Sequence, residues 1–221
     1  MTVLIVGDSY AYGSELSDSP LTSWRDPGKI PHPPSKSSFG ALLADMLSQD
    51  YENYSIPGGS NDRTFRVTFK KILEKKYDFV LCVWTNFSRL DMTYMGIDMP
   101  ITYSNSEYFK EKFPWFKSIF ENHYDPKKDA ESWFTKLISL QSYFTLTKQP
   151  YLFVNSCITK GDFKFIPKSN DRFVNRNNFF GWREDDSLMD MCKNLPQGAG
   201  GHFLQEGHDL VAKKLYEHLT R

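Results

Sequence analysis

Short apolar runs alternate with longer amphipathic stretches along most of this chain. Runs that are apolar on successive positions are typical of strands buried on both faces of a parallel sheet. The stretches between them have the apolar spacing of helices that cover such a sheet. The pattern predicts an α/β fold, a three-layer sandwich with a central parallel sheet and helices on both faces. The predicted strands are 3–6, 51–56, 77–84 and 150–156, and the predicted helices are 38–48, 62–76, 129–147 and 205–220.

Three segments do not fit this regular alternation. Residues 17–38 are rich in Pro and Ser, residues 92–128 are rich in aromatic side chains, and residues 161–181 are polar and irregular. Long ordered loops are commonly functional, so we expect the first two to wall a site and influence substrate choice. The stretch 106–124 is expected to be helical. At 221 residues the chain predicts a single domain over 1–221, with these segments as insertions.

Charge and hydropathy exclude several classes of partner. The chain has 27 basic and 27 acidic residues, so no net field draws it to nucleic acid or to an anionic membrane. No apolar stretch approaches the ~18 residues of a membrane span. The first apolar run is shorter than that of a signal peptide and has no basic residues before it. Cys82, Cys157 and Cys192 have no C-x-x-C spacing and are expected to be free thiols. These features predict a cytoplasmic protein and leave its oligomeric state open.

Polar side chains follow three of the predicted strands, and another precedes the last predicted helix. Ser9 comes after the first strand, Gly58 lies in "SIPGGSNDR" after the second, Asn86 follows the third, and His202 precedes the final helix. The carboxyl ends of parallel strands meet at one sheet edge, where α/β proteins bind ligands. A nucleophile, amide donors and a base are the groups that acyl transfer needs.

Each of these residues also has a purely structural interpretation. Ser9 could cap a following helix, and "PGGSND" is a competent turn and helix start. Asn86 could bond to its own backbone, and His202 could be a solvent-facing histidine. Together, their order and positions favour the catalytic interpretation.

Four blocks spread over the chain carry a resemblance to a known family. "VGDSYAYG", "NYSIPGGSN", "VLCVWTNF" and "HFLQEGHDLVAKKL" are similar to the conserved blocks of SGNH (GDSL-type) hydrolases, which are serine esterases on a flavodoxin-like sheet. The resemblance implies that Ser9 is the nucleophile and His202 the base, while His208 is a helix residue. It also implies an oxyanion hole formed by the amides of Ser9 and Gly58 and the side chain of Asn86. No metal or cofactor is implied.

The sequence departs from the family pattern at three positions. Trp84 and Phe87 replace the usual glycine and aspartate around Asn86, which predicts a narrower, more apolar substrate pocket with Tyr10 beside them. Ala199 stands where the family has the aspartate that orients the histidine. Either a backbone carbonyl holds the imidazole, giving a Ser–His dyad, or an acid comes from "REDDSLMD", with Asp185 and Asp186 as candidates.

The predicted function is hydrolysis of a small acyl ester, for which an O-acetyl group on a carbohydrate is our working substrate. The chain lacks G-x-S-x-G, G-x-G-x-x-G and P-loop motifs, which argues against an α/β-hydrolase elbow and against nucleotide binding. The alternative is a binding module on the same fold, with an impaired site, that holds a glycan or a protein partner. The missing acid at Ala199 and the unusual Trp84 and Phe87 favour that alternative. The intact set of Ser9, Gly58, Asn86 and His202 argues against it.

Overall fold

A central parallel sheet organises the molecule. The computed structural model describes residues 1–19, 33–94, 97–101, 111, 125–183 and 186–221, and the side chains of 92–101 are not described. The sheet has the order β2-β1-β3-β6-β7, with every neighbouring pair parallel. Its strands are β1 (Thr2–Val6), β2 (Asp50–Asn53), β3 (Phe79–Trp84), β6 (Tyr151–Asn155) and β7 (Phe179–Phe180).

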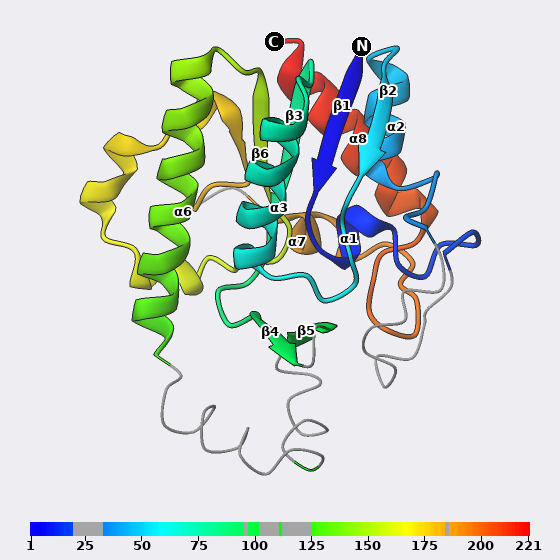
Figure 1. Cartoon of the computed structure of the whole chain (residues 1–221). Helices are drawn as coiled ribbons and strands as arrows, with labels where there is room; N and C mark the ends of the chain where they lie inside the picture. The colour runs from blue at the N-terminus through cyan, green and yellow to red at the C-terminus, as the bar shows by residue number, and fades with distance from the viewer. Residues whose placement is uncertain (20–32, 95–96, 102–110, 112–124, 184–185) are drawn as a thin grey trace.

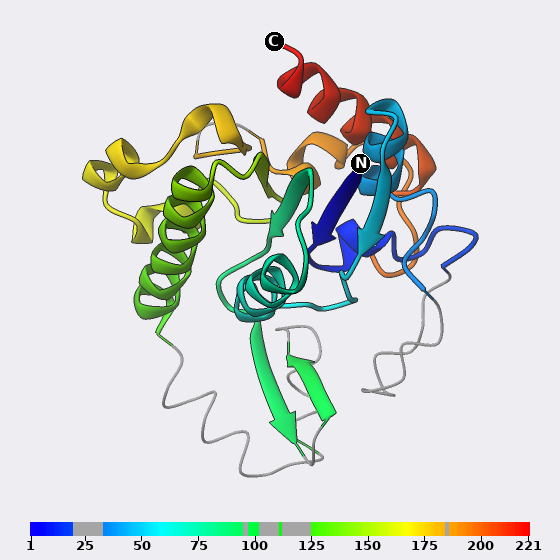
Figure 2. The same cartoon turned by 45° about the horizontal axis from the view of Figure 1, so that its top comes forward.

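Two helical layers cover the sheet, as Figures 1 and 2 show. Successive residues of β1 face opposite sides, so Leu4 and Val6 join the core under α3 and α6 while Val3 and Ile5 join the core under α2 and α8. Each strand is therefore buried on both faces. The α/β sandwich predicted from the sequence is confirmed. The covering helices are α2 (Phe39–Met46), α3 (Asn61–Glu74), α6 (Pro126–Thr147) and α8 (Gln205–Leu219), with a short α7 (Leu188–Cys192).

Local sequence explains where these helices begin. The Ser60 side chain accepts a hydrogen bond from the Arg63 N–H and caps α3. Asp125 caps α6 in the same way, with Pro126 at the first helical position. In α2 the Ser38 side chain forms no cap; instead, buried His208 of α8 accepts the Phe39 N–H at Nδ1, 3.0 Å away. This bond ties α2 to α8.

The irregular segments contain more structure than the sequence predicts. The polar stretch 161–181 forms three 3-10 turns, η1 (Asp162–Phe165), η2 (Lys168–Phe173) and η3 (Arg176–Asn178), and then the edge strand β7. The segment 92–128 begins inside an antiparallel hairpin, β4 (Leu90–Tyr94) with β5 (Ile97–Ile101), beyond the carboxyl edge of the sheet (Figure 1). The predicted helix at 106–124 and most of the loop 17–38 lie outside the described residues.

Candidate active site

Ser9 opens a one-turn helix directly after β1. This helix, α1 (Ser9–Tyr12), is capped by Asp8, whose carboxylate accepts the Tyr10 N–H at 3.1 Å. Gly13 ends it with φ +79°, a left-handed conformation that favours glycine. Because the first N–H groups of a helix have no partner within it, the Ser9 amide is left without a partner in α1. Ser9 itself is almost completely buried.

Gly58 lies in a tight turn after β2. The Gly59 N–H donates to the Ile56 carbonyl at 3.1 Å, so Pro57 and Gly58 occupy the two central positions, and Gly58 has φ +72°. This is the residue pattern of a type II turn, in which the third residue's N–H stays outside the turn's own hydrogen bond. A Cβ at Gly59 would lie 2.9 Å from the Gly7 carbonyl oxygen, so the turn packs directly against the end of β1.

Asn86 follows β3 with its side-chain amide fixed from both ends. Its Oδ1 accepts bonds from the Ser88 N–H and hydroxyl at 3.0 and 2.8 Å, and its Nδ2 donates to Asp162 Oδ2 at 3.1 Å. A second hydrogen on Nδ2 stays available for an oxyanion. Asn61, at the start of α3, anchors this loop by accepting the Thr85 N–H and donating to the Thr85 carbonyl.

His202 precedes α8 and is paired with a carboxylate that we did not predict. Its Nδ1 lies 2.8 Å from Oε2 of Glu15, which also accepts the His202 N–H at 3.1 Å. The other carboxylate oxygen accepts the Gly200 N–H at 2.7 Å. The Glu15 side chain is buried, with 6% exposed. Burial raises its pKa, but the bonds from Gly200 and His202 outweigh that effect and hold the pKa of Glu15 below its usual range.

Two local features let Glu15 reach the loop that carries His202: the positive φ of Glu15 and the glycine at position 198. Glu15 follows the Gly13 helix end and has φ +72°, so the chain turns its side chain toward the loop before α8. A Cβ at Gly198 would lie 2.5 Å from the Glu15 carboxylate, so a larger residue there would displace the carboxylate from this position. Figures 1 and 2 both place this loop beside α1.

Glu15 therefore occupies the position for which the sequence suggested other acids. Asp186 pairs with Lys160 at 3.0 Å and is mostly exposed, so the prediction that it orients His202 is wrong. Asp185 lies outside the described residues. Ala199 has no carboxylate to offer, and a backbone carbonyl is not needed because Glu15 holds Nδ1.

The three residues predicted to line a substrate pocket have different surroundings. The Tyr10 ring contacts the His202 ring edge-on, with centroids 5.2 Å apart, and stacks on Phe203. Trp84 is fully buried against Trp133, so it cannot line a pocket, and that prediction is wrong. Phe87 also packs on Trp133, at 4.8 Å, and is almost completely buried. Both side chains stabilise the core under α6.

Asp8 joins the loops at this edge of the sheet. Its carboxylate is fully buried and, besides capping α1, accepts the Ser156 hydroxyl at 2.7 Å and Arg89 Nη1 at 3.2 Å. Arg89 Nη1 also lies 3.5 Å from the Gly59 carbonyl oxygen. Burial lowers the pKa of Arg89, but the interactions with Cys157 and Asp8 raise it by more. The net shift is upward, so the guanidinium is charged. Asp8 thus connects the segments after β1, β3 and β6, and Arg89 extends the network to the turn after β2.

The remaining observations concern the cysteines, possible metal ligands and possible membrane spans. Cys82, Cys157 and Cys192 are free, buried thiols, as predicted. Within the part of the chain that the structure describes, no three His, Cys, Asp or Glu side chains gather as a metal site would require. No helix among the described residues has the length and apolar character to cross a bilayer.

Comparison with known proteins finds the same fold in esterases. The sequence matches no protein-family model and no curated protein. Among solved structures, a family 2 carbohydrate esterase with a carbohydrate-binding domain from Corynascus thermopiles (Myceliophthora fergusii) aligns with 99% of this chain and 65% of its own, at TM-score 0.55 and 14% identity. The esterase EstA from Pseudoalteromonas sp. aligns over 99% and 96% of the two chains, at TM-score 0.52 and 14% identity.

A third similar structure is the acetyl xylan esterase Est2A from the rumen bacterium Butyrivibrio proteoclasticus, with TM-score 0.52, 12% identity and 99% and 62% coverage. This chain thus spans less than two thirds of the length of both carbohydrate esterases. At these identities the likeness is one of fold. The chain has the α/β fold of SGNH hydrolases, and the resemblance drawn from its four sequence blocks is confirmed at that level.

Proposed function

We propose that this chain is a serine ester hydrolase in which Ser9, His202 and Glu15 form a catalytic triad. The observation that carries the proposal is the 2.8 Å contact between Glu15 and His202 Nδ1, beside the short helix that begins with Ser9. A carboxylate on Nδ1 fixes the tautomer in which Nε2 is free to accept a proton. The esterases that share the fold support the same reaction class.

In the first half-reaction, His202 Nε2 takes the proton of the Ser9 hydroxyl as Oγ attacks the ester carbonyl carbon. The new C–O bond forms, and the carbonyl electron pair moves onto oxygen. When the tetrahedral intermediate collapses, the bond to the alcohol breaks and His202 gives the alcohol its proton. Water then repeats these steps on the acyl-enzyme and releases the acid. Glu15 stabilises the imidazolium each time it forms.

The oxyanion would be held by the backbone amides of Ser9 and Gly58 and by Nδ2 of Asn86. The turn geometry at Gly58 and the anchored amide of Asn86 support this assignment because such donors act best when they are fixed in advance. Asp162 takes one hydrogen of Nδ2, so Asn86 would contribute its other one.

The substrate we propose is a small acyl ester on a carbohydrate, such as an O-acetyl sugar. Two of the proteins with this fold are named as carbohydrate or acetyl xylan esterases, which supports this choice. The alternative of an impaired binding module drew support from the missing acid at Ala199 and from Trp84 and Phe87, which pack into the core on Trp133. Glu15 supplies an acid from another place, so the support from Ala199 falls away.

A fluorophosphonate probe tests the proposal directly, because it labels a serine only where a base and an oxyanion hole activate it. We expect one labelled peptide containing Ser9, no labelling of Ser9→Ala, and hydrolysis of nitrophenyl acetate that requires Ser9 and His202. Ser14→Ala, a buried serine on the same segment, is the matched control and should keep both properties. An unlabelled wild type that hydrolyses no acyl or sugar ester would favour the binding module.

A further inference from the structure

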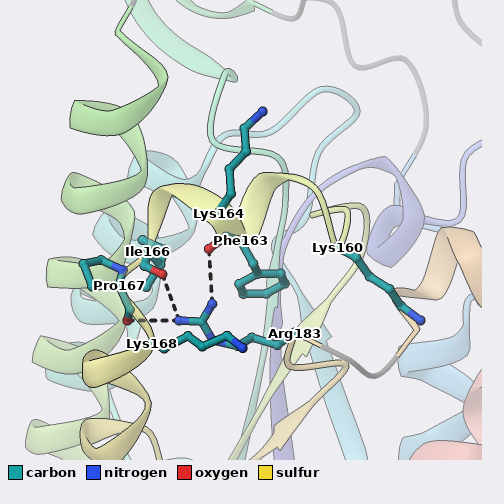
Figure 3. Close-up of a pocket in the computed structure, with 7 residues that line it drawn as sticks. All are labelled: Lys160, Phe163, Lys164, Ile166, Pro167, Lys168 and Arg183. Atoms are coloured by element: carbon teal, nitrogen blue, oxygen red, sulfur yellow. Dashed lines mark hydrogen bonds between the residues drawn. The ribbon is translucent and has the colours of Figure 1, made fainter.

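A basic hollow lies in the segment after β6, where Asp162 is bonded to Asn86 of the candidate active site. Its volume is about 410 Å³ and its lining includes Lys160, Phe163, Lys164, Ile166, Lys168 and Arg183 (Figure 3). Four of these residues carry a positive charge, and none of the described residues that line the hollow is a carboxylate. In a chain with equal numbers of acidic and basic residues, such a local excess is a marked asymmetry.

The charges differ in how far they are neutralised. Arg183 is buried and donates hydrogen bonds to Asp171, at 2.6 Å, and to the carbonyls of Phe163, Ile166 and Pro167. Its role is therefore to stabilise the turn at 163–167. Lys160 pairs with Asp186, but both side chains are more than half exposed, and such pairs are weak. Lys164 and Lys168 are exposed and form no ion pair with any described residue. Counted over the described residues, Lys164 and Lys168 therefore leave the hollow with net positive charge.

The hollow also has a fixed floor and a direct link to the site. Phe163 and Ile166 are almost completely buried, and the Arg183 guanidinium lies 5.6 Å from the Phe163 ring centre. Oδ2 of Asp162, next to Phe163, accepts bonds from the Thr159 N–H and hydroxyl and also from Asn86 Nδ2. The turn that carries Lys160 and Lys164 is thus bonded to the residue we assign to the oxyanion hole.

We propose that this hollow binds the anionic part of the substrate, a carboxylate- or phosphate-bearing saccharide whose acyl group reaches Ser9. The inference rests on the proposed function for its link to hydrolysis. Lysines around a rigid floor suit a sugar with an acidic group, since their long side chains can reach carboxylate or phosphate oxygens at several positions. The balanced charge of the whole chain argues against a nucleic acid as the ligand.

Binding is measured with Ser9→Ala, so that no turnover occurs, by calorimetric titration at low and moderate salt. The ligands are hexagalacturonate for carboxylate, a phosphomannan oligosaccharide for phosphate, neutral maltohexaose, and single-stranded DNA of similar length. We expect at least one acidic saccharide to bind about tenfold or more tightly than maltohexaose, with affinity falling as salt rises. Tighter binding of hexagalacturonate would identify the charged group of the substrate as a carboxylate, and tighter binding of the phosphomannan oligosaccharide would identify it as a phosphate.

Lys164→Gln with Lys168→Gln should weaken that binding about fivefold or more. Lys70→Gln with Lys213→Gln is the matched control, because it removes the same charge from exposed lysines on α3 and α8. Equal binding of neutral and acidic saccharides, tighter binding of DNA, no binding at all, or equal weakening by the control pair would each overturn the inference. Because binding is read without turnover, an inactive but binding-competent protein would contradict only the proposed function.

Discussion

The carboxylate of Glu15 lies 2.8 Å from Nδ1 of His202, although the two residues are separated by most of the chain. Glu15 follows Ser9 on the same short segment, so the proposed nucleophile and its acid both come from the end of β1. The acid also accepts the His202 and Gly200 N–H groups. It therefore fixes the backbone of the histidine loop as well as the imidazole ring.

Replacing Glu15 by Gln should lower kcat on nitrophenyl acetate by a factor on the order of 10²–10⁴, with a smaller effect on KM. Gln keeps the side-chain length, but it no longer stabilises the imidazolium and can favour the wrong tautomer. Initial rates against substrate concentration measure the effect, and Glu206→Gln, an exposed change on α8, is the control. A Glu15→Gln enzyme within a few-fold of wild type would show that Glu15 only supports the loop.

Restoring the family's aspartate by Ala199→Asp should leave kcat of the otherwise unchanged enzyme within about twofold, because Glu15 already occupies Nδ1 of His202. The same change in a Glu15→Ala background should recover part of the lost rate if the loop can present the new carboxylate. A large gain from Ala199→Asp alone would mean that Glu15 does not serve as the acid.

The elements of the sandwich follow from local pattern, and what the sequence missed depends on distant contacts. The predicted strand 3–6 and helix 205–220 correspond closely to β1 and α8, because apolar periodicity encodes them. The edge strand β7 has only two residues and lies in a polar segment, so no apolar periodicity predicts it. Its pairing with β6 is set by the tertiary structure.

The same distinction applies to the site. The order of Ser9, Gly58, Asn86 and His202 could be predicted because each follows a strand or precedes a helix. Glu15 could not, because its contact with His202 depends on a positive φ and on a glycine at position 198. The sequence did offer one signal for Glu15: it is a glutamate that comes shortly after Ser9 and after Gly13, which ends the helix. Trp84 could have been assigned to the core, since the whole of β3 reads as buried on both faces.

Asn86→Ala should lower kcat by a factor on the order of 10²–10³ with little change in KM, because an oxyanion donor acts mainly in the transition state. Steady-state kinetics on nitrophenyl acetate separate the two constants. Asn175→Ala, which removes the cap of η3, is the control and should leave kcat unchanged. If Asn86→Ala changed KM alone, Asn86 would be a binding residue rather than an oxyanion donor.

Arg89→Met should destabilise the fold by about 3–5 kcal/mol, because it leaves the fully buried carboxylate of Asp8 without its counter-charge. The double variant Asp8→Asn with Arg89→Met should recover part of this loss, since a neutral amide can still cap α1 and bond to Ser156. Urea unfolding measures both free energies. Lys214→Met, which breaks an exposed pair on α8, should cost less than about 1 kcal/mol. Additive losses at Asp8 and Arg89 would contradict the coupling.

The last prediction concerns pH, and it turns on His208. Burial, with a smaller effect from His202, lowers the pKa of His208 to about 3, so the folded protein keeps this imidazole neutral and uses Nδ1 to accept the Phe39 N–H. The unfolded chain protonates it near its ordinary value of 6.5. Between these values the unfolded state binds more protons, so stability rises with pH, and it is lost as the pH falls below about 6.5.

The slope from this one group approaches about 1.4 kcal/mol per pH unit once the pH is well below 6.5. Glu15 adds a loss of the same sign, because its pKa is also lowered on folding, but only as the pH approaches the ordinary glutamate value of 4.5. Burial raises the pKa values of Asp91 and Asp129, which act with the opposite sign, so the contribution of His208 is taken from the difference between wild type and a His208 variant in urea unfolding between pH 7 and 5. His208→Gln, whose amide oxygen can still accept the Phe39 N–H, should flatten the dependence in that range, while His218→Gln on the same helix should not. An unchanged slope in His208→Gln would show that the imidazole is not held neutral by the packing of α2 on α8.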